Sequence, residues 1–104
     1  MPFIALEKRQ YLKNGDCRFY KAAGHKVLLI RQQDRYFAID SICPHAGASL
    51  RKGRLAGACI RCPKHGIHFD LATGRPVGGD AVADVAPLRC FEVVLRGDDV
   101  GILV

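Results

Sequence analysis

The chain lacks long apolar runs and sustained helical periodicity, and its acidic residues are few. No stretch approaches the roughly 18 apolar residues of a membrane-spanning helix. The first residues, MPFIALEKRQ, also lack the basic-then-apolar layout of a secretory signal peptide. We therefore expect a cytoplasmic protein that does not have a membrane as a partner.

The cysteine count of five is odd, which argues against a secreted disulfide framework. The 104 residues, 49% of them hydrophobic, are enough to build one packed core without crosslinks. In a reducing compartment, clustered cysteine and histidine residues indicate a metal more often than disulfides. We expect a single domain over residues 1–104.

Sixteen basic residues against ten acidic ones give a formal net charge of +6. The basic residues are scattered, with no basic helix and no alternation of aromatic and basic side chains of the RNA-binding kind. We therefore expect no nucleic-acid partner, and we assign the charge to a face that docks an acidic protein. Arg51, Lys52 and Arg54 are candidates for a docking rim, and a solvated basic loop is the simpler alternative.

Strand patterns dominate the chain and predict two hairpins, Lys26–Arg31 with Arg35–Asp40 and Cys90–Arg96 with Val100–Val104. The segment over residues 41–76 is rich in glycine, proline and alanine. Short strands are predicted at its residues 58–61 and 68–71. The prediction is an all-β fold of antiparallel strands that carries an inserted segment with cysteine and histidine residues.

Two cysteine–histidine pairs lie in this inserted segment, Cys43 with His45 and Cys62 with His65. Sixteen residues separate His45 from Cys62. Two thiolates and two imidazoles suit zinc, iron or an iron–sulfur cluster. Two such turns that face each other could hold a single ion or the two ends of a binuclear cluster, and both remain open at this point.

The segment CPHAGASLRKGRLAGACIRCPKHGIHFDLATGRP resembles the cluster-binding segment of Rieske-type [2Fe–2S] proteins. The match is C-x-H, sixteen residues, C-P-x-H-G and an F-D-L-x-T-G tail. This resemblance implies a Rieske-like fold, in which a cluster-binding subdomain at about residues 42–74 is inserted in a β base. It also implies one [2Fe–2S] cluster per chain, with Cys43 and Cys62 on one iron and His45 and His65 on the other, and the imidazoles facing solvent.

Departures from the Rieske pattern indicate the subtype. Respiratory Rieske proteins have a further, disulfide-linked cysteine in each ligand loop, whereas Ala48 and Lys64 occupy those positions here. Ile67 and Phe69 stand where those proteins have a serine and a tyrosine that donate hydrogen bonds toward the cluster. Because lost donors leave the reduced cluster less stabilised, we expect a reduction potential near about −150 mV rather than about +300 mV.

The resemblance points to the ferredoxin component of a bacterial ring-hydroxylating oxygenase (dioxygenase) system, as used in aromatic hydrocarbon catabolism. It implies an electron-transport protein rather than an enzyme, which docks transiently with a flavin-dependent ferredoxin reductase and a terminal oxygenase. One alternative is the small Rieske-like subunit of an assimilatory nitrite reductase. The other is a zinc-stabilised interaction module with Cys59, Cys62, His65 and His68 as ligands.

The remaining candidate residues are expected to be structural. Cys17 and Cys90 are predicted to be buried thiols, and Cys59 is predicted to face inward from the strand that leads to the second ligand loop. Asp70 and Thr73 are predicted to fix the turn DLATG through side-chain to backbone hydrogen bonds.

Overall fold

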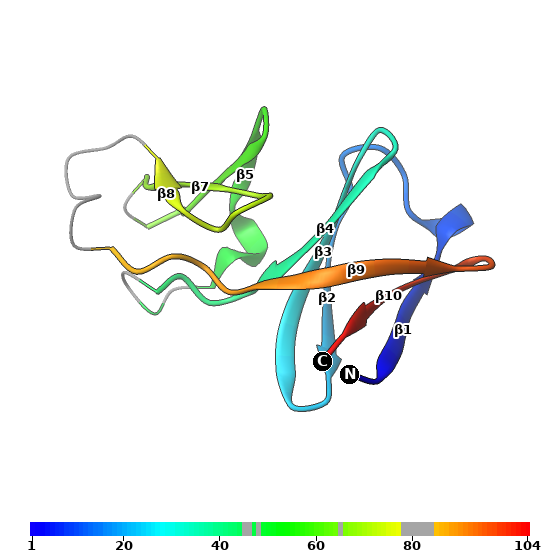
Figure 1. Ribbon diagram of the computed structural model, residues 1–104. Coiled ribbons are helices and arrows are strands. Elements are labelled where there is room, and N and C mark those ends of the chain that lie inside the picture. Colours follow the sequence, from blue (N-terminus) through cyan, green and yellow to red (C-terminus); the bar gives the residue numbers. More distant parts are fainter. Residues whose placement is uncertain (45–46, 48, 65, 78–84) are drawn as a thin grey trace.

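The computed structural model describes residues 1–44, 47, 49–64, 66–77 and 85–104, and its strands form two antiparallel sheets. Figure 1 shows the two sheets side by side in an elongated molecule, with both chain termini at the larger sheet. The predicted all-β class is confirmed. In the described part of the chain no helix is long and apolar enough to cross a membrane.

The larger sheet, which we call the base, has the strand order β1-β10-β9-β4-β3-β2. Its strands are β1 (Phe3–Lys8), β2 (Cys17–Ala22), β3 (His25–Gln32), β4 (Arg35–Asp40), β9 (Cys90–Arg96) and β10 (Asp99–Leu103). Both predicted hairpins are present within one residue of their predicted ends.

The smaller sheet has the strand order β5-β6-β7-β8. Its strands are β5 (Arg54–Ala56), β6 (Cys59–Arg61), β7 (His68–Asp70) and β8 (Pro76–Val77). Two 3-10 turns, η1 (Arg9–Tyr11) and η2 (Leu50–Lys52), are the helical elements of the described residues. All four strands of the small sheet lie between β4 and β9 in the sequence, so the small sheet is an insertion in the base.

Strand β3 explains how the two sheets pack, because its apolar run is buried on both faces. Val27 and Leu29 lie in the core of the base, together with Leu12, Ala22, Ala38, Phe91, Val100 and Ile102. Leu28 and Ile30 point the other way, into a second core that contains residues of the small sheet. Successive side chains of a strand point to opposite faces, so four consecutive apolar residues serve two cores.

The base is curved, so that side chains link its two edge strands, β1 and β2. The Tyr20 hydroxyl on β2 donates a hydrogen bond to Glu7 Oε2 on β1, at 2.8 Å. Arg18 Nη1 lies 3.5 Å from the same carboxylate oxygen. These contacts close the base at a point where the strands do not pair.

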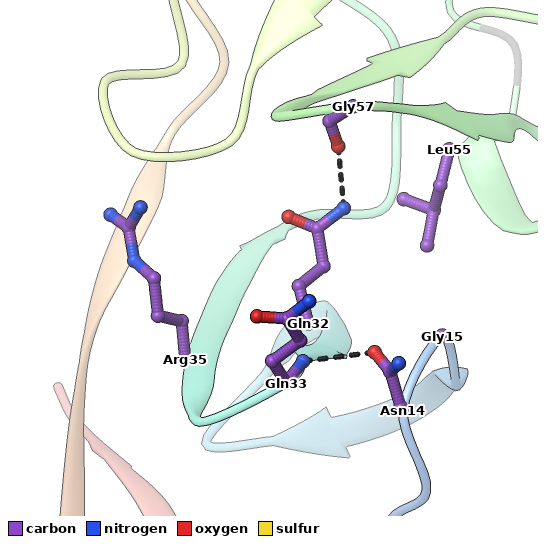
Figure 2. A pocket seen from close by; sticks show the side chains of 7 residues that line it. All are labelled: Asn14, Gly15, Gln32, Gln33, Arg35, Leu55 and Gly57. Atoms are coloured by element: carbon purple, nitrogen blue, oxygen red, sulfur yellow. Dashed lines mark hydrogen bonds between the residues drawn. The ribbon is translucent and has the colours of Figure 1, made fainter.

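A polar contact also joins the base to the small sheet at the end of the β3–β4 hairpin (Figure 2). Gln32 Nε2 donates to the carbonyl oxygen of Gly57, in the turn between β5 and β6, at 2.5 Å. The neighbouring Gln33 N–H donates to Asn14 Oδ1 at 2.9 Å. The hairpin end therefore fixes the β5–β6 turn against the base.

We expect the Tyr20 hydroxyl to ionise at a higher pH than an ordinary tyrosine. Burial and the hydrogen bond to the Glu7 carboxylate raise the pKa of Tyr20 to about 12 from an ordinary value of 10.0. The pKa of Tyr20 is higher in the folded protein than in the unfolded chain, so the protonated hydroxyl stabilises the fold. This stabilisation is complete below about pH 10 and is lost as the pH rises to about 12. Ultraviolet titration of tyrosinate should show one late tyrosine in the wild type, and an earlier one in Glu7→Gln. An unchanged titration in Glu7→Gln would contradict the contact.

Candidate metal centre

The two predicted ligand loops share one backbone arrangement. In the first, the Gly47 N–H donates a hydrogen bond to the carbonyl oxygen of Cys43 at 2.8 Å. In the second, the Gly66 N–H donates to the carbonyl oxygen of Cys62 at 3.0 Å. Both glycines have left-handed backbones, with φ of 65° and 71°. Both loops therefore close as C-P-x-x-G turns, and a glycine suits the fifth position because other residues rarely adopt this φ.

Backbone hydrogen bonds fix the start and the end of each loop. Ser41 N–H bonds to Lys26 O at 3.0 Å, and Leu50 N–H returns to Ser41 O at 2.7 Å on the far side of the first loop. The Cys62 N–H bonds to Ile67 O at 2.8 Å and closes the second loop where it meets the paired strands β6 and β7. Each loop is therefore a short excursion from regular structure that is anchored at both ends.

Both cysteines are buried, whereas residues next to them in the loops are exposed. Cys43 and Cys62 are each 0% exposed. They lie in the second core, whose other members are Leu28, Ile30, Phe37, Ile39, Leu50, Ile60, Ile67, Phe69, Leu71, Val85 and Leu88. Pro44, Pro63 and Lys64 are exposed. Each loop thus runs from an interior cysteine to the protein surface.

This arrangement fits a thiolate-bound cluster. A thiolate inside an apolar core is costly unless a cation neutralises it, and iron does so while keeping the thiol deprotonated. Two buried cysteines on matching loops, each loop also carrying a histidine in the sequence, provide the mixed sulfur and nitrogen donors of a Rieske centre. His45 and His65 lie outside the described residues. Among the described residues alone, no group of three or more possible ligands converges.

Ile67 and Phe69 are both buried in the second core. Their side chains have no hydroxyl and donate no hydrogen bond. The apolar environment is consistent with the low potential that we predict from the sequence, because donors toward a reduced cluster would raise the potential.

The thiols outside the two loops differ from prediction. Cys90 is exposed, so the prediction that it is a buried thiol is wrong. Its neighbour Phe91 is buried in the core of the base, whereas Cys90 pairs with Ile39 on the other face of β9. Cys59 is only partly buried, because the alternation of β6 turns Ile60 into the core instead. Cys17 is also partly buried and packs against the second core.

The predicted turn DLATG is confirmed. Asp70 Oδ1 accepts hydrogen bonds from the N–H groups of Ala72 and Thr73, at 2.8 and 3.1 Å. Thr73 Oγ1 accepts one from the Arg75 N–H at 3.2 Å. These bonds return the chain from β7 to β8, so both residues are structural.

The Rieske [2Fe–2S] domain is the family whose model matches this chain, over residues 3–92. The chain belongs to this family. The predicted Rieske resemblance, fold and cofactor are therefore confirmed, the cofactor being one [2Fe–2S] cluster.

Several similar proteins of comparable length are ferredoxins. Ferredoxin CarAc of Metapseudomonas resinovorans is 32% identical over 83 residues, which make up 80% of this chain and 75% of the relative. The ferredoxin of carbazole 1,9a-dioxygenase from Nocardioides aromaticivorans IC177 superposes with a TM-score of 0.87 at 30% identity, over 98% of this chain and 97% of its own. These relatives are electron carriers rather than enzymes, as predicted for this chain.

Other similar proteins are parts of complexes or enzymes, or are much longer than this chain. A chain from the complex of reduced oxygenase and oxidised ferredoxin in carbazole 1,9a-dioxygenase matches with a TM-score of 0.85 at 29% identity, over 96% of this chain and 91% of that chain. A putative nitrite reductase small subunit matches over the full length of both chains with a TM-score of 0.81, but at 20% identity it shares the fold alone. The chain spans only 10% of the length of the first curated relatives it matches.

Alanine at either loop glycine should weaken the metal centre. We expect Gly47→Ala and Gly66→Ala each to lower the free energy of unfolding by about 1–2 kcal/mol, because alanine is strained at a left-handed φ. Both should also lower the iron content and the visible absorbance of the purified protein.

Gly15→Ala is the matched control, because Gly15 also has a left-handed φ of 87° and open space around it, but lies in the turn before β2, away from the ligand loops. It should lose similar stability and keep its iron. Equal iron loss in all three variants would show that the two loop glycines have no special part in holding the metal centre.

Proposed function

We propose that the chain is a one-electron carrier in which Cys43, Cys62, His45 and His65 hold one [2Fe–2S] cluster. The two cysteines would bind one iron and the two histidines the other. The observation that carries this proposal is the pair of matching C-P-x-x-G loops with their cysteines buried in a single core. When bound, the cluster supplies reversible one-electron reduction.

The residues of the chain have separate tasks in this proposal. The apolar side chains around Cys43 and Cys62 exclude water from the sulfur ligands. The exposed prolines Pro44 and Pro63 bring the outer part of each loop to the surface, where a partner can approach closely. Neutral imidazole ligands make reduction of their iron easier than two further thiolates would.

The proposed cluster-binding subdomain covers about residues 42–74 of one Rieske domain that spans residues 1–104. Two features support this division. The small sheet shares its core with both ligand loops, and the base has a core of its own. The base would then serve as the support of the subdomain.

The proposed partners are a flavin-dependent reductase, which gives the electron, and a terminal oxygenase of a ring-hydroxylating system, which receives it. The oxygenase is supported by the solved complex of an oxygenase with a similar ferredoxin. The reductase is inferred from the need for an electron donor in such a system. The contacts would be transient, because a carrier must leave one partner before it serves the next.

The two alternatives make different predictions. A nitrite reductase subunit would form a stable complex with a large reductase, whereas a carrier would show salt-sensitive, transient docking. The zinc module would need Cys59 as a ligand. Cys59 lies on β6 opposite Asp70 of β7, and its side chain does not share the second core with Cys62.

Low-temperature electron paramagnetic resonance on the dithionite-reduced protein, together with iron and zinc analysis, tests the proposal. We expect a rhombic one-electron signal and two irons per chain. A silent spectrum with one zinc per chain would contradict the carrier and favour the zinc module.

Replacing a histidine ligand by cysteine should lower the reduction potential. In His45→Cys or His65→Cys an anionic thiolate replaces a neutral imidazole, so the oxidised state is favoured. Voltammetry on protein that retains its cluster measures the shift. Cys59→Ser is the control and should change neither the cluster nor its potential, and a potential unchanged in a histidine variant would reject that histidine as a ligand.

A further inference from the structure

The net charge of the chain is concentrated around the ligand loops, although basic residues occur along its whole length. Residues 41–69 contain five basic residues and no acidic residue. The other residues contain eleven basic and ten acidic ones and are therefore almost neutral. Five of the six net positive charges thus belong to the segment that carries the proposed ligands.

All five of these basic side chains are exposed. We call them the basic face: Arg51, Lys52, Arg54, Arg61 and Lys64. Two adjoining surface hollows place most of them around the second ligand loop. Pro63 lines both hollows, the first with Arg51 and Lys52 and the second with Lys52, Arg54 and Arg61. The basic face therefore surrounds the outer end of a ligand loop.

Two arginines of the basic face are held in place. The Arg61 guanidinium lies against the second loop, since a Cβ atom added to Gly66 would be 3.1 Å from Arg61 Nη2. The Arg51 guanidinium lies over the Phe19 ring, 4.3 Å from its centre. The backbone N–H of Arg51 also bonds to Ser49 Oγ at 3.2 Å. Side chains that are already ordered lose less entropy when a partner binds.

The acidic residues that form ion pairs lie elsewhere. Among the described residues, the ion pairs join Lys8 to Asp99 and Arg18 to Glu7 and Asp16, all in the base. In this part of the chain no carboxylate is paired with the basic face. Its positive field is therefore available to a partner.

We propose that the basic face is the docking surface for an acidic face of the redox partners, an inference that rests on the proposed carrier function. Partly exposed Ile42 and the exposed prolines of the two loops provide apolar contact area beside the charges. An apolar centre with a charged rim is the usual composition of a protein–protein interface. Complementary charge steers the encounter and is screened by salt, which suits a carrier that binds and leaves repeatedly.

Poly-L-glutamate is a probe for an acidic protein surface. Its binding tests whether the basic face, rather than the net charge of the protein, binds such a surface, and it does not need the cluster. In Arg51→Glu/Lys52→Glu we expect the dissociation constant to rise about tenfold or more, because local charge dominates such binding. Arg9→Glu/Lys13→Glu is the matched control, with the same net charge and with both changes at exposed residues between β1 and β2. Its dissociation constant should rise much less. Equal rises in the two variants would overturn the proposal.

Lys52→Glu/Arg54→Glu provides a second variant that leaves the Arg51 contact with Phe19 in place. It should weaken binding like the first variant. A normal dissociation constant in a folded Lys52→Glu/Arg54→Glu protein would overturn the proposal. Retention of the wild type on duplex DNA at about 0.15 M salt, lost in this variant, would instead assign the face to nucleic acid and also overturn it.

Electron exchange with charged reagents separates the docking surface from the carrier function. The reduced protein gives one electron to ferricyanide, which becomes ferrocyanide, or to hexaamminecobalt(III), which becomes cobalt(II). We expect salt to slow the reaction with the anion and to speed the reaction with the cation. Arg51→Glu/Lys52→Glu should weaken both salt effects, and Arg9→Glu/Lys13→Glu should keep them.

The outcomes of this experiment are distinguishable. Protein that holds no reducible cluster would contradict the proposed function, while the poly-L-glutamate result would stand. Protein that exchanges electrons with the same salt dependence for both reagents would overturn the docking surface and leave the carrier function intact.

Discussion

Two cysteine side chains without exposed surface, Cys43 and Cys62, lie in one apolar core, and most of the structure serves to place them there. The core is built from both sheets, since Leu28 and Ile30 of β3 contribute to it from the base. A thiolate in an apolar environment is stable only when a cation is bound to it, so the fold couples the metal centre to the packing between the sheets. The ligand loops can then be short and glycine-closed, because their ends are fixed by strands.

The interior and the surface of this centre have opposite properties. Inside, Ile67 and Phe69 share an apolar core with Cys43 and Cys62, and their side chains offer no hydrogen-bond donor. Outside, exposed prolines and basic side chains form the end of the molecule that a partner meets. We expect the first property to keep the reduction potential low, and we propose that the second selects the protein surfaces that approach. An electron carrier needs both, and the two are set by different residues.

Much of the fold was predictable from the sequence where strands follow simple rules. The β3–β4 and β9–β10 hairpins have apolar residues and turns at the expected spacing, and the structure places them within one residue. Strands β5 and β8 were not predicted: β5 has only one apolar side chain larger than alanine, and β8 is a two-residue strand that begins at Pro76. Strand β1 was missed because a bulge between Ala5 and Glu7 interrupts its alternation.

The sequence proposes which residues form the candidate site, but it does not predict how they are arranged. The motif indicated Cys43 and Cys62 as ligands, yet their burial depends on core residues far away in the sequence, such as Ile30 and Leu88. The same dependence explains the error at Cys90, which is exposed although it pairs with the buried Ile39. Likewise, the basic residues look scattered along the chain, and only the structure places Arg54 and Arg61 around Pro63.

The central claim is that two buried cysteines hold one iron and two histidines hold the other. Mössbauer spectroscopy of protein reconstituted with ⁵⁷Fe tests this division most directly, because it reports each iron separately. The account predicts two different iron sites of equal population in the oxidised protein, and on reduction a change confined to the histidine-bound site. A single kind of iron in both states would show equivalent ligand sets and would contradict the account.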